Sequence, residues 1–237
     1  MVNNPYLDFL ASFGIGGAHP GGMPLTIELL QTITIKPEHR LLDVGCGTGQ
    51  TSAFIKKTYG SNVTALDIHP GMIEKARARF YHEQLDIALV QGNAEQLPFN
   101  DNSFDILLIE SVTVFTTIKK SINEYARVLK PGGILLNLEM TANDWFSAAE
   151  LAEIQRVYGI QEVPSEEQWI NYLQDAGLTV TEVLNRESVR QKSIDSISEF
   201  DFGKLMDFSL YTKWMEHINL MEKMGTRLGF RIYKCIK

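Results

Sequence analysis

Residues 41–50, which read LLDVGCGTGQ, decide the fold of this chain. An apolar run ends in an acidic residue, Asp43, and three glycines follow it, Gly45, Gly47 and Gly49. A helical pattern then begins. A strand that enters a helix through such a turn lets the backbone approach a ligand closely, and it aims the unpaired N–H groups of the helix at that ligand. The stretch therefore predicts a site for a nucleotide-like ligand.

Strand and helix patterns alternate from residue 40 to residue 140. We expect strands at about 40–44, 62–67, 86–90, 104–110 and 134–140, and helices at about 50–59, 70–82 and 118–129, the last one stopped by Lys130-Pro131-Gly132-Gly133. The strands are short and apolar on both faces, as a sheet covered by helices on both sides requires. The chain is therefore predicted to form a doubly wound, mostly parallel α/β sheet.

Less regular segments flank this central part. A short helix and a flexible glycine-rich loop are expected within 5–23, and a second helix follows from about residue 25. After residue 140, the patterns predict helices at about 144–158, 165–176 and 194–227, a strand at about 178–188, and a last segment, 230–237, that alternates like an edge strand. We predict a single domain over 1–237, with 40–140 as the ligand-binding core, 1–35 as N-terminal helices and 141–237 as the rest of the sheet.

The composition excludes several classes of protein. A net charge of −7 and a pI of about 5.3 argue against a nucleic-acid partner held by phosphate neutralisation. No segment approaches the about 20 apolar residues of a membrane span, and the N-terminus lacks a signal-peptide pattern. Two cysteines, Cys46 and Cys235, do not make a disulfide framework. We expect a cytoplasmic protein without a membrane partner or a metal site, either a monomer or a homodimer.

Two classes of cofactor fit a strand, Gly-rich turn and helix of this kind. A dinucleotide site needs G-x-G-x-x-G/A, in which the third small residue allows close packing of helix on strand. Counted from Gly45 and Gly47, that third position is Gln50. Because Gln50 is neither Gly nor Ala, the dinucleotide motif fails.

The motif that is present resembles that of the class I S-adenosylmethionine-dependent methyltransferases, above all the small-molecule and quinone-type branch. Their first motif, D/E-x-G-x-G-x-G, matches Asp43 to Gly49. The resemblance extends in order over about 40–140, through GNAEQLPF at 92–99, FNDNSFDIL at 99–107 and RVLKPGGIL at 127–135. It implies a Rossmann-like, seven-stranded sheet with an antiparallel last strand, and S-adenosylmethionine as the cofactor, which becomes S-adenosylhomocysteine.

The resemblance also implies roles for single residues. Asp67, at the end of the second strand, would accept hydrogen bonds from both ribose hydroxyls. Ile68 and Met72 would flank the adenine. Asn93 stands where the family usually has an acid; its amide carries both a donor and an acceptor suited to the adenine edge, and Ala94 would add its backbone N–H. The turn itself, Gly45, Cys46, Gly47 and Gly49, would lie beside the methionine and ribose parts, with Cys46 as a small filler.

No catalytic base stands out in the sequence. The cofactor's methyl group is already activated, so transfer by in-line displacement requires mainly alignment and a shielded site. Four residues are candidates if a base is needed: Glu110, Glu139, His19 and Tyr6. Glu110 and Glu139 are expected at the ends of two strands on the site's edge, where contact with the cofactor or with the acceptor is an alternative role.

The methyl acceptor should be bound by the segments outside the core, namely 1–23, 141–163 and 190–228. We expect these segments to cover the strand ends, and their aromatic residues favour a partly apolar small molecule. Five glycines in the N-terminal segment suggest a movable gate: Gly14, Gly16, Gly17, Gly21 and Gly22.

Three alternatives to a small-molecule methyltransferase stay open. The first is a methyltransferase that acts on RNA or protein. The net negative charge disfavours RNA as the acceptor. Residues 110–113 also give no support, because no NPPY-like or DPPY-like tetrapeptide follows the fourth strand. The second is a cofactor-binding regulator without catalysis. The third is an oxidoreductase, which the failed dinucleotide motif makes remote.

Overall fold

A computed structural model of the protein describes residues 4–13, 19–184 and 208–237. Within these residues one sheet has seven strands in the order β3-β2-β1-β4-β5-β7-β6. β7 is antiparallel to its neighbours β5 and β6, and the other pairs are parallel. The predicted sheet is thereby confirmed. Its strands are β1 (Arg40–Val44), β2 (Asn62–Asp67), β3 (Ala88–Gln91), β4 (Phe104–Glu110), β5 (Leu129–Ala142), β6 (Thr179–Leu184) and β7 (Leu228–Ile236).

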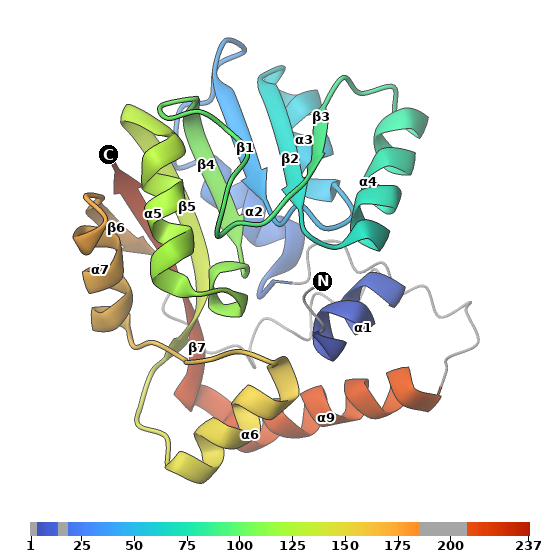
Figure 1. The fold of residues 1–237 in the computed structure, drawn as a ribbon, viewed down its shortest axis with the longest axis vertical. Coiled ribbons are helices and arrows are strands. Elements are labelled where there is room, and N and C mark those ends of the chain that lie inside the picture. Colours follow the sequence, from blue (N-terminus) through green and yellow to red (C-terminus); the bar gives the residue numbers. More distant parts are fainter. Residues whose placement is uncertain (1–3, 14–18, 185–207) are drawn as a thin grey trace.

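Helices cover both faces of the sheet and the edge at which its parallel strands end. Figure 1 shows α5 in front of the strands, α2 and α3 behind them, and α1, α6 and α9 grouped below. The α-helices are α1 (Pro5–Phe13), α2 (Gly22–Leu30), α3 (Gln50–Tyr59), α4 (Pro70–His82), α5 (Ile118–Val128), α6 (Ala148–Tyr158), α7 (Glu166–Asp175) and α9 (Phe208–Met224). Two short 3-10 turns are η1 (Thr113–Phe115) and η3 (Gly225–Arg227). The core lies between these layers, where Leu42 of β1 and Leu107 of β4 are fully buried.

Local sequence signals set several helix ends. Gly60, at φ 68°, ends α3 in the left-handed conformation that glycine adopts without strain. Ser165 and Gln168 form the predicted capping box of α7. A second capping box, of Ser147 with Glu150, starts α6 at Ala148, later than the predicted residue 144.

The segment Lys130-Pro131-Gly132-Gly133 belongs to strand β5, whereas it was predicted to be a helix stop before a strand that begins at residue 134. β5 already starts at Leu129, which pairs with Phe104, and the register then shifts so that Ile134 pairs with Ile106. Gly132, at φ 77°, takes up this irregularity. The prediction missed it because both proline and glycine are typical of turns.

The expectation that the last strand lies at an edge was wrong. β7 pairs with β5 on one side and with β6 on the other, so β6 is the edge strand. Seven of the nine residues of β7 are buried. Alternation along a single strand does not reveal whether a second neighbour pairs with it, because that depends on a distant segment.

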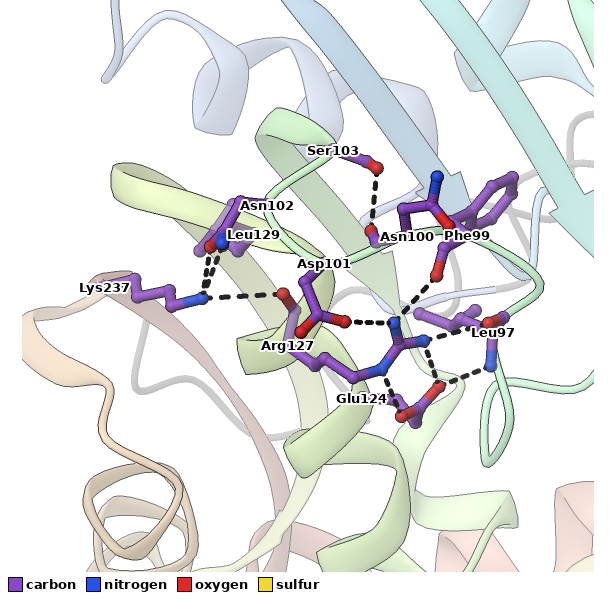
Figure 2. Close-up of polar contacts among 10 residues, drawn as sticks. All are labelled: Leu97, Phe99, Asn100, Asp101, Asn102, Ser103, Glu124, Arg127, Leu129 and Lys237. Atoms are coloured by element: carbon purple, nitrogen blue, oxygen red, sulfur yellow. Dashed lines mark hydrogen bonds and ion pairs between the residues drawn. The ribbon is translucent and has the colours of Figure 1, made fainter.

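The motif RVLKPGGIL at 127–135 begins with Arg127, whose hydrogen bonds are drawn in Figure 2. The Arg127 guanidinium of α5 donates to the backbone carbonyls of Leu97 and Phe99, at 3.0 and 2.8 Å, and to both carboxylate oxygens of Glu124. Asp101 accepts a further hydrogen bond from it at 2.8 Å. Arg127 thereby ties the loop between β3 and β4 to α5, and this loop carries Asn93 at its start.

Some expectations fall on residues that are outside the described ranges. These are the first three glycines of the expected gate, within 14–18, the residues 185–188 of the expected strand, and the part of the acceptor-covering segment at 190–207. Over the described ranges, none of the helices combines the length and the apolar character that crossing a membrane requires.

Candidate active site

The Gly-rich turn after β1 is shaped by three left-handed glycines, Gly45, Gly47 and Gly49, with φ of 73°, 53° and 76°. A Cβ atom on Gly45 would lie 2.2 Å from the Val112 side chain, and one on Gly49 would lie 2.6 Å from the Phe80 ring. A Cβ on Gly47 would meet none of the described protein atoms within 4 Å. Two of the glycines therefore permit tight packing, whereas Gly47 leaves open the space in front of the turn.

Asp67 joins the end of β2 to this turn. Its Oδ2 accepts a hydrogen bond from the Gly47 N–H at 2.9 Å, and its Oδ1 accepts one from the His69 N–H at 2.8 Å. Burial raises the pKa of this carboxyl group, against the effect of the two backbone bonds. Each carboxylate oxygen keeps a further lone pair, so Asp67 can still accept from two hydroxyl groups.

Asp43, at the end of β1, is buried beneath the turn. Its Oδ2 accepts a hydrogen bond from the Ser52 hydroxyl at 2.5 Å. Burial is the largest cause that raises its pKa, to about 7, and the nearby carboxylates of Glu110 and Asp67 act in the same direction. Asp43 thus holds its proton more tightly than a solvent-exposed aspartic acid does.

This raised pKa predicts how stability depends on pH. The folded protein binds the Asp43 proton more tightly than the unfolded chain, whose value is near 3.8, so this contribution is complete at low pH and is lost as the pH rises from about 4 to about 7. In Asp43→Asn, which imitates the protonated form, we expect the free energy of unfolding to fall less between pH 4 and pH 8 than in the wild type. The difference should be at least about 1.4 kcal/mol, the value of one pKa unit.

Urea denaturation at both pH values measures this difference. Burial also raises the pKa of Glu139 to about 7, and Glu139 is unchanged in the variant. The pH dependence of the free energy of unfolding should therefore weaken but not vanish. An Asp43→Asn protein with the full wild-type decrease would show that Asp43 is ionised throughout.

Glu110, at the end of β4, lies in a buried polar cluster. Its Oε1 accepts from the Thr26 hydroxyl of α2 at 2.6 Å, and its Oε2 accepts from the Thr51 hydroxyl of α3 at 3.1 Å. Nε2 of His19 lies 3.1 Å from the Thr26 oxygen and 3.5 Å from Glu110 Oε1, while its Nδ1 lies 3.2 Å from the Pro20 carbonyl. The carboxylate thus links α2, α3 and the segment before α2 to the strand end.

Glu139 has a different environment from the one expected. It is fully buried in β5 and accepts hydrogen bonds from the backbone N–H groups of Val112, Thr113 and Val114, at 3.3, 2.8 and 3.2 Å. These bonds hold the η1 turn after β4. Because Glu139 does not line the cavity described below, the structure separates it from the other candidates for a base.

The loop after β3 presents Asn93 and Ala94 to the same edge. Oδ1 of Asn93 accepts a hydrogen bond from the Glu95 N–H at 2.9 Å, so the amide nitrogen is the group of this exposed side chain that can donate to a ligand. Ala94 is buried. Asn93 is therefore both a turn former and a donor, where the family's usual acid would be an acceptor alone.

A cavity of about 290 Å³ lies at the carboxyl ends of the strands, where ligands bind in open α/β sheets. It joins most of the predicted site residues: Tyr6, His19, Asp43, Gly45, Cys46, Gly47, Asp67, Ile68, Met72, Asn93, Ala94 and Glu110. Gly49 and Glu139 do not line it. Burial raises the pKa of the Cys46 thiol, consistent with a filler and not a reactive thiolate.

One wall of the cavity consists of residues that were not predicted as site residues, most of them within the segments that were expected to cover the strand ends. Trp214, His217 and Met221 of α9 line it together with Tyr158 of α6 and Phe115 of η1. The spacing of three and then four residues in α9 puts its three side chains on one helix face. That spacing was a usable signal, but aromatic and methionine residues at helical spacing also fit an ordinary packing face.

Comparison with known proteins identifies the family of this chain. Residues 42–137 match the sequence family described as "Methyltransferase domain". The chain is 34% identical over 232 residues, 98% of its length and 99% of the relative's, to the uncharacterized methyltransferase YodH of Bacillus subtilis. The chain belongs to the S-adenosylmethionine-dependent methyltransferases. This methyltransferase is also 30% identical, over 75% of its length and 73% of the relative's, to a ubiquinone/menaquinone biosynthesis C-methyltransferase of Zymomonas mobilis.

Solved structures share the fold of this methyltransferase. The [4+2]-cyclase SpnF matches with a TM-score of 0.81 at 22% identity, over 98% of this chain and 92% of that one. Phosphoethanolamine N-methyltransferase 2 of Haemonchus contortus, with S-adenosyl-L-methionine, matches with a TM-score of 0.76 at 21% identity, over 98% of this chain and 56% of that one. At these identities the likeness concerns the fold.

Proposed function

We propose that the protein binds S-adenosylmethionine in this cavity and transfers its methyl group, by in-line displacement, to a partly apolar small molecule. The observation that carries the proposal is the juxtaposition of the open space at Gly47 with the Asp67 carboxylate, 2.9 Å from the Gly47 N–H. The turn offers backbone at close range, and the carboxylate offers two acceptor oxygens beside it.

The charge of the cavity fits this cofactor. Four carboxylate residues line it, Asp43, Asp67, Glu95 and Glu110, and no lysine or arginine is among its described lining residues. S-adenosylmethionine carries a sulfonium and an ammonium group, so carboxylates on several sides favour it. Asp67 would hold the ribose hydroxyls, with Asp43 and Glu110 toward the methionine part.

The remaining predicted cofactor contacts are compatible with an adenine group at the end of the cofactor opposite its methionine part. Ile68 and Met72 supply apolar flanks, the Asn93 amide supplies a donor, and Ala94 supplies its backbone N–H. Once bound, the cofactor supplies an activated methyl group, and the protein contributes alignment and exclusion of water.

The acceptor would lie against the cover formed by α1, α6 and α9, which contact one another below the strand ends (Figure 1). This arrangement supports the assignment of 1–23, 141–163 and 190–228 to acceptor binding. We also infer a cytoplasmic setting, which the two buried free thiols, Cys46 and Cys235, support.

Incubation with methyl-labelled S-adenosylmethionine and a metabolite extract tests the proposal. Mass spectrometry should find a labelled small molecule with wild-type protein and none with Asp67→Ala. Tight cofactor binding without any labelled product would favour a cofactor-binding regulator, and label in RNA or protein fractions would favour a macromolecular acceptor.

A further inference from the structure

The cavity has a part that the cofactor contacts do not explain. Beyond the Gly-rich turn, rings from four elements line it: Tyr6 of α1, Phe115 of η1, Tyr158 of α6 and Trp214 of α9. The Tyr6 ring stacks on Phe115, with centroids 6.0 Å apart, and meets Tyr158 edge-on at 4.9 Å. This aromatic part, together with His217, is suited to an apolar ring compound.

Two polar groups in the aromatic part have no hydrogen-bond partner within the part of the chain that the structure describes. Neither the Tyr6 hydroxyl nor Nε2 of His217 has a hydrogen bond to any of the described residues, although both side chains line the cavity. Their rings are neighbours, with centroids 5.9 Å apart. Polar groups in an apolar wall cost free energy unless a ligand or water pairs with them, so they indicate where a ligand is polar.

The hydrogen bond between Tyr158 and His217 indicates which ring nitrogen of His217 carries the hydrogen. The Tyr158 hydroxyl is buried, and its partner among the described residues is Nδ1 of His217 at 3.0 Å. Burial raises the pKa of Tyr158 and lowers that of His217 to about 4, so at neutral pH the phenol keeps its proton and the imidazole is neutral. Donation from the phenol to Nδ1 gives the buried hydroxyl its acceptor, since no other acceptor for it is found among the described residues, and this arrangement places the imidazole hydrogen on Nε2.

Tyr6 is a second donor. Burial raises its pKa, so the phenol stays protonated, which makes Tyr6 a poor base but a good hydrogen-bond donor. The aromatic part of the cavity thus presents two neutral donors, Tyr6 Oη–H and His217 Nε2–H, within apolar walls. Such donors favour an oxygen that accepts hydrogen bonds, and more so when negative charge develops on it.

We propose that Tyr6 and His217 bind a hydroxyl or carbonyl oxygen on the ring of the methyl acceptor, and that Tyr158 positions His217 for this contact. The proposal rests on the proposed methyltransferase function and narrows its acceptor to oxygen-bearing ring compounds.

Two ring compounds of equal size test the proposal: 2-naphthol, and 2-methylnaphthalene, in which a methyl group replaces the hydroxyl. With S-adenosylhomocysteine bound, the wild-type protein should bind 2-naphthol about tenfold more tightly, because one neutral hydrogen bond is worth about twofold to tenfold in affinity. This preference should fall below about threefold in Tyr6→Phe and in His217→Leu. His217→Gln, whose amide can donate from a similar place, should keep most of it.

Tyr211→Phe is the matched control, because Tyr211 is an exposed phenol on α9 that does not line the cavity. It should keep the wild-type preference. In ¹⁵N spectra of histidine-labelled protein, the His217 hydrogen should be on Nε2, and in Tyr158→Phe it should distribute over both nitrogens.

Equal binding of the two compounds by the wild type would overturn the proposal, as would an unchanged preference in Tyr6→Phe and His217→Leu or a hydrogen on Nδ1 of His217. Binding of S-adenosylhomocysteine, measured by calorimetry in the same proteins, tests the proposed function separately. A wild type that does not bind it contradicts that function, whereas one that binds it without preferring 2-naphthol contradicts only the role of the two donors.

Discussion

Asp67→Ala should weaken the binding of S-adenosylhomocysteine about 100-fold or more. The substitution removes two acceptor oxygens from a buried position beside the turn, and hydrogen bonds to a charged group are worth about 1.5–3 kcal/mol each. It also removes the 2.9 Å bond that holds the Gly47 N–H. Isothermal titration calorimetry measures the loss, and Asp67→Asn, which keeps one acceptor oxygen, should fall between the wild type and the alanine variant.

Asp105→Ala is the control for this substitution. Asp105 also accepts a hydrogen bond from a backbone N–H, that of Arg40 at 2.9 Å, but it does not line the cavity. Its replacement should leave the affinity within about twofold of the wild type. If Asp67→Ala folds and binds as tightly as Asp105→Ala, Asp67 does not hold the ribose hydroxyls.

Gly47→Val should abolish measurable cofactor binding, and Gly47→Ala should weaken it severely. A Cβ atom here would meet no atom of residues 4–13, 19–184 and 208–237 within 4 Å, so a side chain would project into the space that the cofactor is proposed to fill. The substitution also strains the backbone, since Gly47 has φ +53° and such strain costs about 1–3 kcal/mol. A comparison with the wild type alone would not separate these two effects.

The variant Gly60→Ala separates the effect of backbone strain from the effect of filling the cofactor space. Gly60 too is left-handed, at φ +68°, has open space where a Cβ atom would lie, and is not part of the cavity wall. Thermal denaturation should show a similar loss of stability in Gly60→Ala and Gly47→Ala, whereas calorimetry should show weakened binding in Gly47→Ala alone. Equal affinities in the two variants would place the cofactor away from the turn.

The strand-and-helix core could be predicted from the sequence because its signals are local. The boundaries of β1, α3, β2, α4 and β4 agree with the prediction, since each is set by a short apolar run, a glycine or a proline in its own neighbourhood. The cofactor candidates also came from local motifs, and parallel strands bring their ends to one edge.

Two of the failures have a common cause in pairing between distant segments. β7 proved to be interior because β6, some 50 residues earlier, pairs with its second side. Glu139 proved to be a buried acceptor for three N–H groups of the η1 region because β5 lies beside β4. Neither neighbour can be deduced from the segment itself.

The sequence by itself determined the alternation of strands and helices, the Gly-rich turn and its acidic partner Asp67, because each depends on the conformations that a few adjacent residues favour. Only the tertiary structure decided which side chains share the cavity. It brings Tyr6 and His217, from opposite ends of the chain, to a ring separation of 5.9 Å, and it buries them enough to set which groups keep their protons. Burial and proximity of this kind arise from packing between helices that are remote in the sequence, and no local pattern encodes them.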